Sequence, residues 1–304
     1  MKFPVLSLNQ IALGSLIVSV IVLGIKYTAF LFTGSIALYS DALESIINIG
    51  TACAAIVAIR FAAQPPDTKH PYGHYKVEYM SAVAVGILII IAALVILYEA
   101  YSAFIEPKHI SASWIGLLVS GMATVLNALW SKFLVQQGRL HHSAALTADG
   151  KHLMADVITS IGVLVGVVLV FMTGIEILDP VLASLVAINI LWSGWKVVTD
   201  NASVLIDEEI PSGDLTRIKQ IISENIQGAL EVHALRSRYA GKAAFVEFHL
   251  VVAGSMSVGE AHDICDRIEE ALKNEFPCIF VNIHVEPERK AKHRHKNVLS
   301  RNVL

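Results

Sequence analysis

One apolar segment of the chain carries two carboxylates and an imidazole at helical spacing. The stretch TADGKHLMADVITS, within residues 147–172, places Asp149, His152 and Asp156 at positions i, i+3 and i+7, on one face of a helix. A charged side chain near the centre of a bilayer costs about 2.5–3.5 kcal/mol, so charges inside a membrane span mark functional positions. Carboxylate oxygens and an imidazole nitrogen are ligands of zinc and related divalent ions.

A second polar stripe lies in the earlier apolar stretch YSDALESIIN, residues 39–48. Its members follow the same periodicity and are Asp41, Glu44, Ser45 and Asn48. Two helices with polar stripes in lipid satisfy these groups best by facing one another, so the stripes predict one ion site between the two helices. A proton relay or a hydrogen-bonded cluster without metal is the alternative.

Two further groups of candidate ligands lie outside the apolar segments. The loop 62–76 holds Asp67, His70 and His74 within eight residues, and one carboxylate with two imidazoles suffices for a divalent ion. A polar loop with incidental histidines is the alternative. Residues 209–287 hold four of the 12 histidines and a nearby glutamate: His233, His249, His262, His284 and Glu286. They favour a metal site, with ordinary surface histidines as the alternative.

The two polar stripes lie in two of six apolar runs of about 20 residues. Each of the six runs is long enough to cross a bilayer. The 304-residue chain is 55% hydrophobic with a mean hydropathy of +0.60, which is too apolar for an ordinary soluble protein. The net charge of −3 suggests no nucleic-acid partner. The runs lie near residues 8–32, 36–60, 79–104, 112–136, 147–172 and 179–199.

Basic residues set the expected orientation in the membrane. They concentrate around the connection between the second and third runs, around the connection between the fourth and fifth runs, and at the end of the sixth run: Arg60, Lys69, Lys76, Lys132, Arg139 and Lys196. By the positive-inside rule, both termini are cytoplasmic. Lys26 is a lone cation inside the first run, and we expect its stem to snorkel from the outer end of the span to the interface.

From about residue 209 the pattern becomes that of a small soluble domain. Periodicity and turn residues predict the order α-β-β-α-β, with the second helix opened by a capping box of Ser257 and Glu260. We expect one antiparallel sheet with both helices on one face. The chain thus divides into a six-span membrane domain, a soluble domain and a basic, mobile tail, at residues 1–208, 209–287 and 288–304.

Together these motifs resemble the cation diffusion facilitator family, and most of all its bacterial zinc/iron branch. The likeness runs from about residue 10 to 287 and rests on HLMAD, DTKHPYGHYKVE, VHALRSRYAG, FVEFHL, EAH and NIHVEP. It implies a homodimeric secondary transporter, not an enzyme, in the inner cell membrane. Such a protein exports a divalent cation, usually zinc, in exchange for protons. It also implies that the soluble domain has a ferredoxin-like metallochaperone fold and contributes to dimer contact.

The resemblance also implies a role for each candidate ligand. Asp41, His152 and Asp156 match the transport site, and Asp67, His70 and His74 match the loop site. A two-metal cytoplasmic cluster is matched by His233, His249, His262 and His284, with Glu286 where an Asp is usual. Lys76 and Asp207 match a pair that locks the spans near the dimer interface. Zinc is then both substrate and structural or regulatory ion, and no catalytic cofactor is implied.

One position departs from the family pattern. The second span in this branch usually reads D-x-x-x-D, and the fourth position after Asp41 is Ser45. Because a hydroxyl is a poorer zinc ligand than a carboxylate, Glu44, Asn48 or water must complete the shell. An oxygen-rich shell of this kind would tolerate Fe²⁺, Mn²⁺ or Cd²⁺ more readily.

The ligand chemistry itself predicts antiport, because metal binding requires a neutral imidazole and ionised carboxylates and so displaces protons. Alternating access to a site at mid-membrane would then move the cation out and protons in. Two other functions remain as alternatives at this point. One is a membrane-bound metal sensor or regulator; the other is an intramembrane metalloenzyme, against which the chain has no H-E-x-x-H motif.

Overall fold

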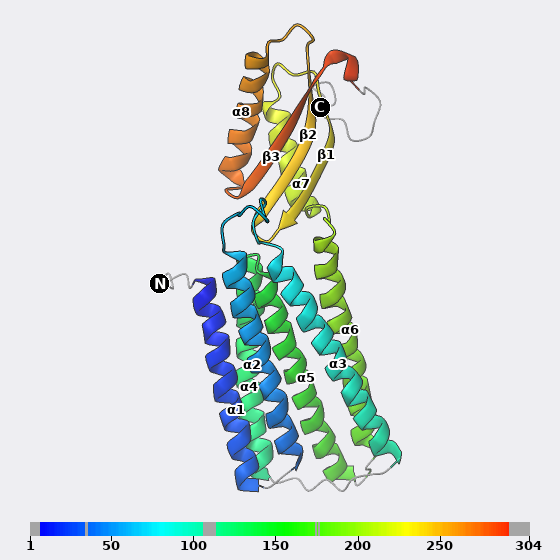
Figure 1. Cartoon of the computed structure of the whole chain (residues 1–304). Coiled ribbons are helices and arrows are strands. Elements are labelled where there is room, and N and C mark those ends of the chain that lie inside the picture. Colours follow the sequence, from blue (N-terminus) through cyan, green and yellow to red (C-terminus); the bar gives the residue numbers. More distant parts are fainter. Residues whose placement is uncertain (1–6, 34–35, 106–113, 174, 176, 292–304) are drawn as a thin grey trace. The chain divides into compact units, whose positions relative to one another are not determined.

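The computed structural model describes residues 7–291, apart from 34–35, 106–113, 174 and 176, and divides the chain into two compact units, Met1–Ala202 and Ser203–Leu304. All six apolar runs form helices (Figure 1), as predicted. They are α1 (Leu8–Thr33), α2 (Ile36–Ala62), α3 (Val77–Ile105), α4 (Trp114–Leu140), α5 (Ala144–Thr173) and α6 (Leu178–Leu205). The tail from residue 292 onward lies outside the described residues.

The helices of the first unit are suited to lipid. Five of them contain described stretches long and apolar enough to cross a membrane, in α1, α2, α3, α4 and α6. The remaining helix, α5, is the one that carries Asp149, Lys151 and Asp156. Large apolar side chains that a soluble protein would cover, such as those of Leu118 and Trp192, lie exposed on the outer faces of the helices. The first unit is therefore a membrane domain.

Helix α5 lies between two groups of helices (Figure 1), and it contributes to both of their cores. Leu146 and Leu153 pack with apolar residues of α1, α2 and α4, whereas Ala148 and Ala155 pack with those of α3 and α6. Contact with α4 is close at Gly150, where an added Cβ would lie 2.8 Å from the Val135 side chain. Small residues that let helix backbones approach in this way are typical of membrane bundles.

The second unit has the predicted α-β-β-α-β order. Its elements are α7 (Ser212–Asn225), β1 (Glu231–Ala240), β2 (Ala243–Val252), α8 (Val258–Glu275) and β3 (Ile279–Pro287), followed by a short 3-10 turn, η1 (Glu288–Lys290). The capping box at the start of α8 is confirmed. The Ser257 side chain accepts a hydrogen bond from the Glu260 backbone N–H, and the Glu260 side chain accepts one from the Ser257 backbone N–H.

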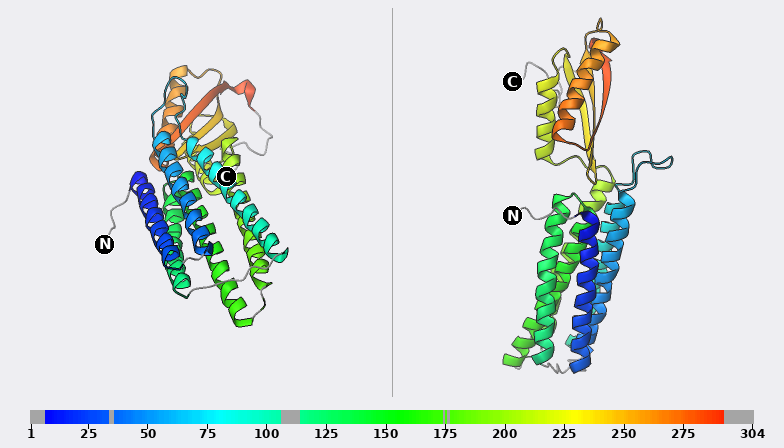
Figure 2. Two further views of the ribbon diagram at one scale, coloured as in Figure 1. Left: turned by 60° about the horizontal axis from the view of Figure 1, so that its bottom comes forward. Right: turned by 90° about the vertical axis from the view of Figure 1, so that its left-hand side faces the viewer.

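The sheet has the order β1-β2-β3, and the prediction that it is wholly antiparallel was wrong. Strands β1 and β2 form an antiparallel hairpin, but β2 and β3 run parallel. The physical reason is α8, which crosses the sheet between β2 and β3 and returns the chain to the end where β2 begins. Both helices cover one face of the sheet (Figure 2), where residues such as Phe248 and Leu250 form a core with Ile222 and Ile268.

Candidate metal sites

The membrane unit holds a buried polar layer around one carboxylate oxygen. Asp156 Oδ2 accepts hydrogen bonds from Asn127 Nδ2 at 2.9 Å and from Asn48 Nδ2 at 3.3 Å. The Nζ atom of Lys26 lies 3.6 Å from the same oxygen, and the side chains of Lys26 and Asp156 are only 1% and 7% exposed. Helices α1, α2, α4 and α5 thus all contribute a polar side chain to this layer.

His152 lies one helical turn before Asp156, on the same face of α5. Its side chain is buried, and among the described residues neither of its ring nitrogens has a hydrogen-bond partner. Buried polar groups are nearly always hydrogen-bonded, and the exceptions are often sites that await a ligand. The Oδ1 atom of Asn127 is also buried without a hydrogen-bond partner in the described part of the chain. An imidazole nitrogen and an amide oxygen are therefore available to a cation beside Asp156.

The fully buried Asp149 forms a second polar layer. It accepts hydrogen bonds from the hydroxyl groups of Ser15 at 2.6 Å and Thr51 at 2.9 Å. Thr51 and Asn48 are on the same face of α2, and they contact Asp149 and Asp156 respectively. The polar stripes of α2 and α5 therefore face one another, as their periodicity predicts. Asp149 differs from Asp156 because both of its oxygens are already hydrogen-bonded to hydroxyl groups.

The prediction for Lys26 was wrong. Its side chain does not snorkel to the interface but is buried inside the bundle, in an ion pair with Asp156. A buried carboxylate offers the ammonium group a partner that lipid does not, and this compensates for its removal from water. The sequence does contain the signal, because an ionisable residue within a span usually faces the interior of the bundle.

The other residues of the α2 stripe differ in how far they can be described. Ser45 and Asn48 are buried, and Asn48 contacts Asp156 directly. The side chains of Asp41 and Glu44 lie outside the described part of the structure. Among the described side chains, the residue that α2 brings to Asp156 is therefore Asn48, which the sequence analysis named as one of several groups able to complete the shell.

The loop after α2 brings its three candidate ligands together. His74 Nε2 lies 3.0 Å from His70 Nδ1 and 3.5 Å from Asp67 Oδ2, and one ligand atom from each residue lies within 4.8 Å of the others. The backbone N–H of His70 donates to Asp67 and, with that of Lys69, lowers the pKa of this carboxyl. An ionised carboxylate beside two imidazoles is an arrangement that a divalent cation can bridge.

A third cluster lies across the three strands of the sheet. His233, His249 and His284 are paired in register, on the face opposite α7 and α8. Glu286 is central: its carboxylate lies 3.4 Å from His233 Nε2, 3.3 Å from His249 Nδ1 and 3.7 Å from His284 Nε2. Strand alternation explains the shared face, because residues two apart on one strand and partners across strands point the same way.

Glu231 is a buried carboxylate beside this cluster that was not among the candidates predicted from the sequence. Its Oε1 atom lies 3.0 Å from His233 Nδ1, on the side of the imidazole ring away from Glu286. A carboxylate at this position holds the imidazole in orientation and increases its basicity toward a metal. The signal was the spacing of two residues between Glu231 and His233, which places both side chains on one face of β1.

For two residues, His262 and Asp207, the described contacts do not include the partners that the family resemblance implies. His262 lies on α8, 71% exposed and 3.6 Å from Asp266, on the helix-covered side of the sheet rather than with the other histidines. Asp207 accepts a hydrogen bond from Arg238 at 3.1 Å within the second unit. Its pairing with Lys76 of the first unit stays a prediction.

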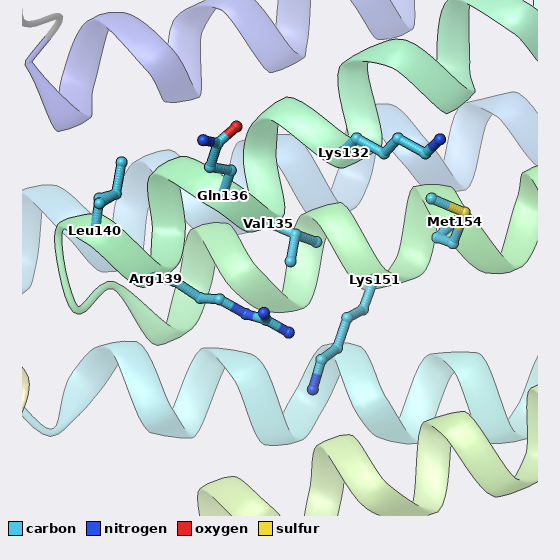
Figure 3. Close-up of a pocket in the computed structure, with 7 residues that line it drawn as sticks. All are labelled: Lys132, Val135, Gln136, Arg139, Leu140, Lys151 and Met154. Atoms are coloured by element: carbon cyan, nitrogen blue, oxygen red, sulfur yellow. The ribbon is translucent and has the colours of Figure 1, made fainter. Parts of the chain in front are cut away.

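A groove of about 580 Å³ between α4 and α5 has none of the candidate ligands in its lining (Figure 3). The cations Lys132, Arg139 and Lys151 line it, together with apolar and amide groups. Three positive charges repel a divalent cation, so this groove is unsuited to bind one.

Comparison with known proteins agrees with this architecture. The family model of the cation efflux transmembrane domain matches residues 12–206, and that of the cation efflux protein cytoplasmic domain matches residues 210–288. The chain therefore belongs to the cation efflux family, which confirms the resemblance seen in the sequence. It is a membrane transporter rather than an enzyme.

Individual relatives cover most of the chain. It is 38% identical over 265 residues to an uncharacterized transporter of Synechocystis, covering 87% of this chain and 86% of that one. It is 29% identical over 276 residues to the cation-efflux pump FieF of Pectobacterium atrosepticum, covering 91% of each. A solved structure of the zinc form of CzrB is 49% identical, with a TM-score of 0.27, and covers 28% of this chain and 98% of that one.

Proposed function

We propose that this cation efflux protein exports a divalent metal ion, zinc foremost, in exchange for protons. The observation that carries the proposal is the buried His152, whose unpartnered ring nitrogens lie one helical turn from Asp156 in the middle of the bundle. Imidazole and carboxylate are ligands that zinc accepts, and Fe²⁺, Mn²⁺ and Cd²⁺ accept them as well. The names of FieF as a cation-efflux pump and of the CzrB zinc form support this class of substrate.

Proton exchange follows from the chemistry of these ligands. A metal ion binds the neutral imidazole and the ionised carboxylate, so loading the ion from the cytoplasm releases protons. Protons that arrive from outside weaken the binding of the ion to the site. An imidazole ordinarily titrates near pH 6.5, which lies within the range of pH values found on the two sides of a bacterial membrane. Alternating exposure of the site completes the exchange. Asp41 and Asn48 of α2 and Asn127 of α4 supply further oxygens.

The protein acts as a homodimer in the inner cell membrane, with both termini in the cytoplasm. Arg60 and Arg139 lie in the last turns of α2 and α4, at the ends that the positive-inside rule assigns to the cytoplasm. The cytoplasmic unit provides dimer contact, and its cluster around Glu286 binds zinc as a structural or regulatory ion. The three imidazoles and one carboxylate already gathered on one face of the sheet support this role.

The test is transport by the purified protein in liposomes. With an imposed pH gradient, we expect zinc to move across the membrane and protons to move in the opposite direction, with Fe²⁺, Mn²⁺ and Cd²⁺ compared in competition. Zinc flux without proton counterflow would disprove antiport. The absence of flux for all four ions would disprove the proposed function.

A further inference from the structure

We propose that the ammonium group of Lys26 is the resident cation of the transport site. It balances Asp156 when no metal ion is bound, and it competes with the transported ion for the same carboxylate. This inference rests on the proposed function, because it concerns how the transport site controls its affinity. It makes Lys26 a residue that sets the affinity for the substrate, although it is not itself a metal ligand.

Lys26 lies close to the position that a metal ion bound to Asp156 would occupy. Lys26 Nζ lies 3.6 Å from Asp156 Oδ2 and is 1% exposed. A zinc ion bound to Asp156 would lie about 2.0–2.2 Å from a carboxylate oxygen, and hence within about 6 Å of Nζ. Two cations this close repel strongly where water is absent. Metal binding therefore requires the ammonium group to withdraw, which its flexible four-carbon stem allows.

The neighbours of Asp156 explain why a resident cation is needed. The hydrogen bonds from Asn48 and Asn127 come from neutral amides, so they satisfy the carboxylate oxygen without neutralising its charge. An ionised carboxylate without a counterion is costly to bury. Lys26 supplies the positive charge from a different helix, α1. The site can thus stay closed and dry without a metal ion.

Competition by Lys26 also favours release. A transporter site must bind its ion firmly enough to load it and weakly enough to let it leave. The Lys26 ammonium group, which stays attached to α1 and returns to Asp156 as the metal leaves, lowers the affinity for the metal without removing any ligand. Consequently, Lys26 is expected to raise both the zinc concentration needed for half-maximal transport and the maximal rate.

The test compares Lys26→Gln with Lys132→Met in the full-length protein. Glutamine keeps a hydrogen-bond donor for Asp156 but removes the charge, so we expect zinc affinity to increase about tenfold or more. Both KM for zinc and kcat should fall, because release becomes slower. A purely structural role would lower kcat without a fall in KM. Lys132 lines the groove between α4 and α5, so its substitution removes a lysine charge outside the site and should leave both constants unchanged.

Three outcomes decide the proposal. If the wild type transports zinc but Lys26→Gln has the same zinc affinity as Lys132→Met, Lys26 is no competitor and the proposal is wrong. If the wild type transports no metal, the proposed function has failed instead. Should Lys26→Gln not fold, Lys26→Arg decides: it keeps the charge and must bind zinc no more tightly than the wild type, so tighter binding would overturn the proposal.

Discussion

The proposed membrane site and the cytoplasmic cluster contain the same kinds of candidate ligand in opposite surroundings. In the membrane, Asp156 is enclosed by amide groups and an ammonium group from three other helices. On the sheet, Glu286 lies among three imidazoles, and one of them, His284, is 66% exposed. A metal ion must displace the ammonium group in the first place, whereas in the second the three imidazoles that surround Glu286 are themselves possible ligands. The first arrangement suits an ion that is transported, and the second suits an ion that stays bound.

Removal of a membrane ligand should give the largest effect. We expect His152→Ala or Asp156→Ala to reduce zinc transport more than about 100-fold, since loss of outer-shell partners alone costs about 10–100-fold in metal affinity. Zinc binding by the cytoplasmic cluster should persist in both variants. Liposome flux and equilibrium zinc binding measure the two effects separately. Undiminished transport in both variants would refute the assignment of the transport site.

The reverse experiment changes the sheet. Glu286→Gln removes the charge that three imidazoles share, so zinc binding to the cytoplasmic cluster should weaken about 10–100-fold. Transport at saturating zinc should continue, because His152 and Asp156 are intact. Glu247→Gln is a matched control, because Glu247 lies on the neighbouring strand β2, two residues from His249 and thus on the same face of the sheet. Complete loss of transport in Glu286→Gln alone would mean that the cluster is part of the transport path.

A smaller effect is expected from Ser45→Asp, which adds a carboxylate to the buried face of α2. With Asp41, His152 and Asp156, the added carboxylate would complete a set of four ligands with the tetrahedral geometry that zinc prefers and Mn²⁺ does not, so selectivity for zinc over Mn²⁺ should increase by about tenfold. Competitive flux measurements with paired ions provide the readout. An unchanged ion profile would show that Ser45 does not determine selectivity.

The smallest effect should come from Ser257→Ala, which leaves all three ligand groups intact. Loss of the cap should destabilise α8 by about 1 kcal/mol, measurable as faster amide hydrogen exchange. The backbone N–H and the hydroxyl group of Ser257 both donate to the Glu260 carboxylate and lower its pKa, and Ser257→Ala removes the hydroxyl contribution. A lowered pKa in the folded state means that this contribution is present above the usual Glu pKa and is lost as the pH falls. The exchange difference between Ser257→Ala and wild type should therefore shrink in acid.

The sequence predicts local features better than contacts between distant residues. Helical periodicity correctly paired the stripe of Asp149 and Asp156 with that of α2, because lipid leaves polar faces few alternatives. The loop ligands were found because Asp67 and His74 are close in sequence. Lys26 and Asp156 are 130 positions apart, and no pattern within α1 reveals which helix faces the lysine. Asn127 was missed because a single amide in a span carries little signal.

The soluble unit shows the same limit. The concentration of histidines grouped His233, His249 and His284, but the sequence could not reveal the direction of β3, which depends on the path of α8. The inclusion of His262 rested on the number of histidines in this part of the chain and on the family resemblance. Its position on the helix-covered side is a property of the assembled layers, which no local spacing encodes.

The shared position of α5 has a mechanical consequence for transport. Leu146 and Leu153 pack with one helix group, and Ala148 and Ala155 with the other, so α5 is the boundary along which the two groups could slide. Lys26, Asn48 and Asn127 all come from the first group, and all three contact Asp156. A shift of α3 and α6 along α5 would therefore leave this shell intact, whereas a shift of α5 together with them would separate Asp156 from its partners. In the second case one movement would both open the site and dismantle the shell around the ion.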